Sequence, residues 1–127
     1  MKLWCGSGRS LGFVCAPSLL QKVVAKHQGL TSDISAYEEN RALIYEMITS
    51  CGFEAVRPDG AFYLFVKSPS GDGNEFSERA KKYELLIVPS DSFGMTGYVR
   101  ISYCVSRKQI ENSKPTFEAL ARSYELI

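Results

Sequence analysis

The sequence predicts an α+β fold: a two-layer domain in which helices pack on one face of a mainly antiparallel sheet of about four strands. Strand-like segments begin near residues 53, 61, 85 and 97, with helix-like segments before, between and after them. The first two strand-like segments flank the turn sequence Pro58-Asp59-Gly60, which favours an antiparallel hairpin. The chain has 127 residues, of which 45% are hydrophobic, so one globular domain can bury a core.

Two helices are expected before the first strand. Pro17 suits the first turn of a helix over residues 17–28, and a second helix is expected between about residues 32 and 52. The apolar stripe of the first helix consists of Leu19, Leu20, Val23 and Val24. The apolar side of the second consists of Tyr37, Ile44, Met47, Ile48 and Cys51.

The hairpin is expected to have strands over residues 53–57 and 61–67. Both alternating sets of side chains in its second strand are apolar: Phe62, Leu64 and Val66 on one side, and Ala61, Tyr63 and Phe65 on the other. One side can meet the helices, but the chain has too few further elements to cover the other. We therefore expect an uncovered aromatic surface that meets a twin subunit, a ligand or another domain of a longer protein.

The second half of the chain alternates between helix and strand patterns. A short helix is expected over residues 75–83, followed by a buried strand over 85–88 that Pro89 ends. After the loop 90–96, a second strand is expected over residues 98–104. A final helix is expected to start near Ser106, which has capping-box spacing to Gln109, and Pro115 must kink it or begin a new helix.

One charged side chain, Arg100, stands in the middle of the last strand. Period-two alternation separates it from the apolar set Val99, Ile101 and Tyr103 and places it with Tyr98, Ser102 and Cys104. A guanidinium held on a rigid strand can bind a carboxylate through two parallel hydrogen bonds. Arg100 is therefore a candidate anchor for an acidic ligand, and an arginine on a solvated sheet face is the alternative.

Composition argues against several classes of protein. With 23% charged residues, a net charge of +1 and no strongly basic run, no nucleic-acid partner is expected. No segment is long and apolar enough to span a membrane, and the first ten residues lack the apolar stretch of a signal peptide, so we expect a cytoplasmic protein. Cys5, Cys15, Cys51 and Cys104 lie far apart with a single histidine, His27, which favours reduced thiols over a metal site.

Five segments stand out by their order and spacing: residues 12–21 (GFVCAPSLLQ), 37–41 (YEENR), 57–65 (RPDGAFYLF), 88–94 (VPSDSFG) and 98–103 (YVRISY). Together they resemble the C-terminal part of class I aminotransferases, the pyridoxal-phosphate enzymes of the aspartate aminotransferase superfamily, fold type I. The resemblance covers nearly the whole chain from about Arg9 onward. Residues 1–8 match nothing in this family.

The resemblance implies a place for this chain in a larger enzyme. In that family the closing segment forms a small α+β domain resting on a larger cofactor domain, so residues 9–127 would be the C-terminal small domain and residues 1–8 an unassigned leader. The large cofactor domain is absent from the sequence. The resemblance also implies that Arg100 binds the α-carboxylate of an amino-acid or keto-acid substrate, that the full-length enzyme uses pyridoxal 5'-phosphate, and that it forms a homodimer.

The sequence departs from the family in three respects. Ser90 stands where glycine is common, so a positive φ there would strain the loop. Cys15 stands where asparagine is frequent. None of the eight lysines lies in a segment like the family's serine-rich lysine segment, so we assign no catalytic, cofactor-binding or metal-binding residue.

The sequence thus predicts a fragment of an aminotransferase that transfers an amino group between an α-amino acid and an α-keto acid. The fragment would supply the carboxylate anchor, would hold no cofactor covalently and would be inactive alone. Two alternatives remain open. One is a free-standing α+β small-molecule-binding or regulatory module that forms a homodimer through its aromatic face, and the other is a structural interaction domain.

Overall fold

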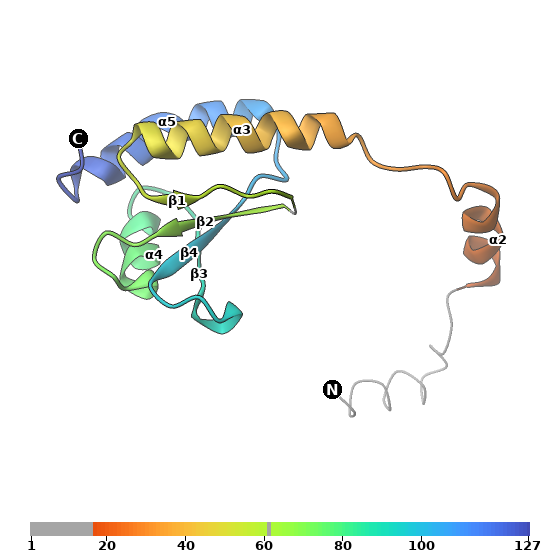
Figure 1. Cartoon of the computed structure of the whole chain (residues 1–127), viewed down its shortest axis with the longest axis horizontal. Coiled ribbons are helices and arrows are strands. Elements are labelled where there is room, and N and C mark those ends of the chain that lie inside the picture. The colour runs from red at the N-terminus through yellow and green to blue at the C-terminus, as the bar shows by residue number, and fades with distance from the viewer. Residues whose placement is uncertain (1–16, 61) are drawn as a thin grey trace. The chain divides into compact units, whose positions relative to one another are not determined.

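The computed structural model describes residues 17–60 and 62–127. The chain divides into two compact units, Met1–Ser32 and Asp33–Ile127. The first unit contributes one described helix, α2, and the second contains the sheet and the other helices (Figure 1).

Helix α2 (Ser18–Lys26) confirms the helix expected after Pro17. Pro17 is the N-cap of this helix, with φ of −54° and an extended ψ of 134°, so the first helical residue is Ser18 rather than Pro17 itself. No residue of α2 is buried. The side chains of its expected apolar stripe are 47% to 74% exposed, so among the described residues this stripe adds nothing to a core.

Four short strands form one antiparallel sheet in the order β1-β2-β4-β3. Their bounds are Ala55–Val56 for β1, Tyr63–Lys67 for β2, Val88–Pro89 for β3 and Tyr98–Ser102 for β4. The predicted hairpin is confirmed, because β1 pairs with β2 with Ala55 opposite Val66. In the central pair, Phe65 of β2 lies opposite Arg100 of β4.

Three α-helices and one 3-10 turn complete this unit: α3 (Ile34–Ser50), α4 (Gly73–Lys81), η1 (Asp91–Phe93) and α5 (Arg107–Arg122). The predicted capping box of α5 is confirmed, since Ser106 Oγ accepts from the Gln109 amide and the Gln109 side chain accepts from the Ser106 amide. The helix continues through Pro115 rather than starting anew there.

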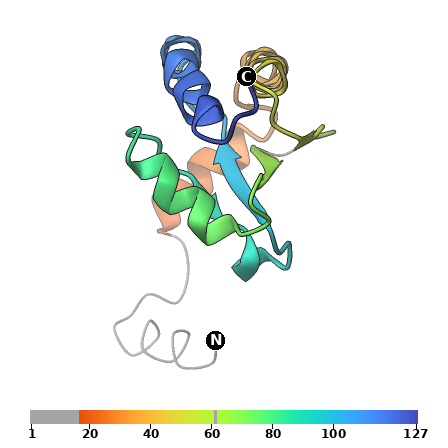
Figure 2. The same ribbon diagram turned by 90° about the vertical axis from the view of Figure 1, so that its left-hand side faces the viewer.

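The α-helices of the second unit pack on one face of the sheet, as predicted (Figure 2). The sheet contributes Leu64, Val66, Val99 and Ile101 to this face, each at most 8% exposed. The helices contribute Ile44, Met47, Ile48, Phe76, Ala80, Ile110, Phe117, Leu120 and Ala121. The two-layer α+β architecture follows, and the alternation that sets Val99 and Ile101 apart from Arg100 is confirmed.

The strand predicted over residues 85–88 is wrong for its first three residues. Strand β3 begins only at Val88 and ends with Pro89, which is its last residue rather than the residue after it. Ile87 is buried, but Leu86 is 85% exposed. An apolar run of this length does not by itself distinguish a strand from a loop that crosses the core.

The local reason lies at the end of α4. Glu84 adopts the left-handed conformation with φ of 61°, and the Leu85 amide donates back to the Ala80 carbonyl at 3.1 Å. This reversal ends the helix in the manner of a Schellman turn. The Ser77 hydroxyl then donates to the Ile87 carbonyl at 2.7 Å, so a side chain rather than a neighbouring strand satisfies this buried backbone group.

A polar cluster joins α4 to the end of α5. Glu75 Oε2 accepts from the hydroxyls of Tyr124 and Ser70, both at 2.7 Å, and Glu75 Oε1 accepts from Arg79 Nε at 2.7 Å. Burial opposes ionisation of Glu75, but the hydrogen bonds from Tyr124 and Ser70 and the charge of Arg79 outweigh it and lower the pKa of this carboxyl. Burial, with the hydrogen bond and charge of Glu75, raises the pKa of Tyr124.

We expect Tyr124→Phe to lower the free energy of unfolding at neutral pH by about 1 kcal/mol, because one charge-assisted hydrogen bond is lost at a partly exposed site. The folded-state pKa of Glu75 lies below its ordinary value of 4.5, so the carboxylate stabilises the fold above that pH. This stabilisation is lost as the pH falls through the folded pKa. In urea unfolding the difference between wild type and variant should shrink below about pH 4.5, and a pH-independent difference would contradict the assignment.

Candidate functional site

Arg100 lies in the middle of β4, on the sheet face opposite α3, α4 and α5. The register aligns Val56, Phe65, Arg100 and Val88 in one row across this face, one residue from each strand. Arg100 is half-buried, and its neighbours along the row are apolar. The strand therefore holds a cation in an otherwise apolar row of side chains.

Two aromatic rings flank the Arg100 guanidinium. Its Cζ lies 4.2 Å from the ring centroid of Tyr63 in β2 and 3.9 Å from that of Phe93 in η1. Within residues 17–60 and 62–127, the guanidinium has no hydrogen-bond or ion-pair partner. Its N–H donors are therefore available to a ligand.

We use the name open face for the sheet surface around Arg100, with Phe93 of η1 beside it. From the strands it comprises Val56, Tyr63, Phe65, Lys67, Val88, Tyr98, Arg100 and Ser102. Val56, Tyr63, Val88 and Phe93 are 40% to 50% exposed. The uncovered aromatic surface expected from the sequence is therefore present, and clustered exposed apolar side chains are typical of a contact surface or ligand groove.

The turn that precedes Tyr63 is held from two sides. Arg41 Nη1 of α3 donates to the Asp59 carbonyl at 3.0 Å. The Tyr103 hydroxyl donates to the Gly60 carbonyl at 3.2 Å. These contacts fix the chain just before the residue whose ring flanks Arg100.

Ser90, at the start of the loop that carries Phe93, introduces no backbone strain. Its φ is −96°, so the positive φ considered from the sequence does not occur. The Ser90 carbonyl accepts from the Phe93 amide at 2.9 Å, which shapes the loop. The side chain is fully buried, and its Oγ makes no hydrogen bond with any described residue.

We expect Ser90→Ala to raise the free energy of unfolding by about 1 kcal/mol, because it removes a buried hydroxyl that lacks a hydrogen bond. Ser77→Ala is the matched control. Ser77 is equally buried, but its hydroxyl donates to Ile87, so the same change should lower stability by about 1 kcal/mol. Chemical denaturation of both variants measures the contrast, and equal losses would contradict it.

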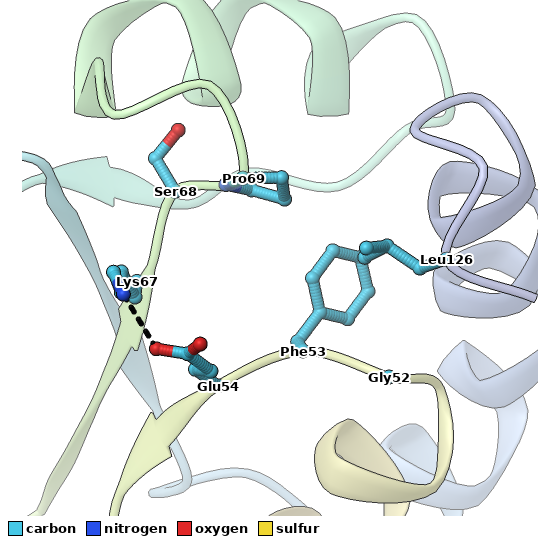
Figure 3. A pocket seen from close by; sticks show the side chains of 7 residues that line it. All are labelled: Gly52, Phe53, Glu54, Lys67, Ser68, Pro69 and Leu126. Atoms are coloured by element: carbon cyan, nitrogen blue, oxygen red, sulfur yellow. Dashed lines mark hydrogen bonds and ion pairs between the residues drawn. The ribbon is translucent and has the colours of Figure 1, made fainter.

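A separate pocket of about 220 Å³ lies between the start of β1, the end of β2 and the chain's C-terminus (Figure 3). It is lined by Gly52, Phe53, Glu54, Lys67, Ser68, Pro69 and Leu126. Its two charged side chains pair with each other, Lys67 Nζ lying 2.7 Å from Glu54 Oε2. The pocket does not include Arg100, Tyr63 or Phe93 and offers no unpaired cation to an acidic ligand.

Two of the four cysteines, Cys51 and Cys104, lie among the described residues. Cys51 is a buried free thiol and Cys104 an exposed one, whereas Cys5, Cys15 and the leader 1–8 lie outside the described residues. In the part of the chain that the structure describes, no three histidine, cysteine or acidic residues are grouped as a metal site would need. Nor does any helix in that part have the length and apolar character needed to cross a membrane.

Comparison with known families identifies the chain. The sequence model of the family described as "Aminotransferase class I and II" matches residues 10–113. The chain belongs to this family. The resemblance that the sequence segments indicated is therefore confirmed.

Aminotransferases of known structure have the same fold. An aminotransferase from Eubacterium rectale is 55% identical, with a TM-score of 0.84 over 94% of this chain and 30% of that chain. Thermus thermophilus aspartate aminotransferase, solved with maleate, is 32% identical, with a TM-score of 0.65 over 68% of this chain and 23% of that chain. Among curated relatives, aromatic-amino-acid aminotransferase 2 of Thermococcus litoralis is 33% identical over 72% of this chain and 25% of its own length. The chain thus spans about a quarter of such relatives.

The described residues of this aminotransferase chain do not by themselves fit pyridoxal phosphate. A lysine that forms a Schiff base is activated by burial or by a nearby cation. All the described lysines are exposed: Lys22, Lys26, Lys67, Lys81, Lys82, Lys108 and Lys114. The hydrogen bond with Glu54 raises the pKa of Lys67, which favours its unreactive charged form. None of these lysines is a candidate for the Schiff base.

In this aminotransferase chain, the sequence indicated Arg100 as a candidate anchor for an acidic ligand. It did not indicate the two aromatic rings that flank Arg100. Alternation separated Tyr63 from Phe62 and Leu64, but the sequence did not indicate which of these two sides of β2 the helices would cover. Nothing in the sequence indicated a role for Phe93 beyond its presence in the segment 88–94. Its approach to Arg100 depends on the path of η1, which no local pattern encodes.

Proposed function

We propose that residues 9–127 are the C-terminal small domain of a pyridoxal-phosphate-dependent aminotransferase, and that Arg100 binds the α-carboxylate of its substrate. The full enzyme transfers an amino group between an α-amino acid and an α-keto acid. The observation that carries the proposal is a guanidinium on a rigid strand, on an uncovered face, with no internal acidic partner among the described residues.

The physical chemistry of the open face supports this role. A planar fork of N–H donors matches the two oxygens of a carboxylate, and such charge-assisted bonds are stronger than neutral ones. The apolar row around Arg100 lowers the local dielectric once a partner covers it, which strengthens the attraction to an anion. The Thermus thermophilus relative was solved with the dicarboxylate maleate, which makes maleate a suitable probe for this chain.

The remainder of the enzyme must supply what the described residues lack. A large domain of the same enzyme would hold the cofactor, cover the open face and form the homodimer, in the cytoplasm. Exposed apolar side chains at Val56, Tyr63, Val88 and Phe93 support contact with such a domain. The isolated chain should then fold without binding pyridoxal phosphate covalently and without turnover.

The test compares the chain alone with a hybrid enzyme, in which residues 9–127 replace the matching 30% of the Eubacterium rectale aminotransferase. We expect the hybrid to show Schiff-base absorbance and transamination, and the isolated chain to show neither when pyridoxal phosphate is added. Robust transamination by the isolated chain would overturn the proposal. So would a well-folded hybrid that binds the cofactor but does not turn over.

A further inference from the structure

Among the described residues, two aromatic rings and no acidic side chain lie against the Arg100 guanidinium. Tyr63 comes from the start of β2, and Phe93 comes from the end of η1, so the two rings belong to elements far apart in the sequence. Their centroids lie 4.2 Å and 3.9 Å from Arg100 Cζ, well within the range of cation–π attraction.

We infer that Tyr63 and Phe93 are positioning residues that hold the Arg100 guanidinium ready for a carboxylate while leaving its donors free. This inference rests on the proposed function of Arg100. An acidic side chain could also orient the guanidinium, but it would occupy the N–H donors that the ligand needs. Aromatic rings attract the cation through their π faces and accept none of its strong hydrogen bonds.

The position of each ring is fixed by its own local structure. Tyr63 pairs with Ser102 in the central strand pair, directly after the turn held by Arg41 and Tyr103. The loop of Phe93 is closed by the hydrogen bond from the Phe93 amide to the Ser90 carbonyl. An arginine side chain has considerable rotamer freedom, so a fixed pair of rings reduces the entropy that ligand binding would otherwise remove.

The loop of Phe93 is also tied to α4. Asn74 Nδ2 donates to Asp91 Oδ2 at 2.9 Å, and Gly94 closes η1 in the left-handed conformation with φ of 79°. The ring therefore belongs to a loop attached to the helix layer rather than to a free surface segment. This attachment makes Phe93 suitable for fixing the side chain of Arg100.

The first readout is the Arg100 side-chain Nε–H proton resonance in the full chain, assigned by its loss in Arg100→Lys. Flanking rings should shift this proton upfield of those of the other arginines. Phe93→Leu or Tyr63→Leu should move it back towards them, whereas Phe93→Tyr and Tyr63→Phe, which keep a ring, should not. An Arg100 resonance that coincides with those of exposed arginines in the wild type would overturn the inference.

The second readout is the hybrid enzyme, with maleate as a competitive inhibitor. Each leucine variant should weaken maleate binding and raise KM by roughly 3- to 30-fold, the range expected from a partly desolvated cation–π contact, with little change in kcat. The ring-preserving variants should restore both values. If Arg100→Ala impairs the hybrid but the leucine variants keep the wild-type KM, the inference is overturned and the proposed function still stands. An Arg100→Ala hybrid with wild-type KM and maleate binding would overturn the proposed function itself.

Discussion

Arg100→Ala in the hybrid enzyme is expected to lower kcat/KM by roughly 100- to 1,000-fold, equivalent to about 3–4 kcal/mol of binding free energy. The substrate carboxylate would lose two charge-assisted hydrogen bonds and remain in a poorly hydrated site. Most of the loss should be in KM, because the anchor binds the carboxylate in the ground state as well as in the transition state. Steady-state kinetics with an amino-acid and a keto-acid substrate measure the effect.

Two further variants make this result specific. Arg100→Lys keeps the charge but loses the planar fork, so it should recover only part of the activity. Arg122→Ala removes an exposed arginine at the end of α5, in the helix layer, and should leave the kinetics unchanged. Equal losses in Arg100→Ala and Arg122→Ala would indicate a general effect of charge and contradict the anchor role.

The parts of the fold predicted correctly are those determined by local chemistry. The capping box at Ser106 is formed by residues three positions apart, and the placement of Arg100 on the sheet face opposite that of the buried Val99 and Ile101 follows from alternation within one strand. The hairpin followed from the turn sequence between β1 and β2. Each of these features needs only a few neighbouring residues to be specified.

The errors arose where burial depends on distant partners. Residues 85–87 are apolar enough to read as a strand, yet after the left-handed Glu84 they form a loop in which Ile87 is buried and accepts the hydrogen bond from Ser77, while Leu86 is 85% exposed. The apolar stripe of α2 has the spacing of an amphipathic helix, and its side chains are exposed in the part of the chain that the structure describes. Hydrophobic pattern gives a preference for burial and does not say what supplies the cover.

The candidate site could be predicted only in part, because it too depends on contacts between distant segments of the chain. Alternation placed Arg100 on the open face, and the resemblance supplied a role for it, but the contact with Phe93 could be known only from the path of η1.

The segment 37–41 contributes to the site indirectly, by holding the chain that follows β4. Its Asn40 is buried and donates to the carbonyls of Tyr103 and Val105 at 3.3 Å and 2.8 Å, which fixes the chain beyond β4. The segment therefore supports the strand of Arg100 from the helix layer.

Phe76→Ala is expected to lower the free energy of unfolding by about 3–5 kcal/mol, because Phe76 of α4 is only 1% exposed and packs against the rings of Phe53 and Tyr124. Its ring centroid lies 5.5 Å from those of both Phe53 and Tyr124. A domain of this size has about 5–15 kcal/mol in total, so the variant should lose a large fraction of its stability. Urea unfolding followed by circular dichroism measures the loss.

Leu86→Ala is the matched control, because it also shortens a large apolar side chain but at a position that is 85% exposed, so it should change stability by less than about 0.5 kcal/mol. A large loss of stability in Leu86→Ala would contradict the exposed position of Leu86 and support the buried strand predicted over residues 85–88. Helix α4 also lies directly against the strand of Arg100, since a Cβ added at Gly73 would clash with the Tyr98 carbonyl oxygen. If Phe76→Ala loosens α4, the Arg100 resonance should broaden at urea concentrations below the unfolding transition, because the strand and the η1 loop lose the helix that supports both.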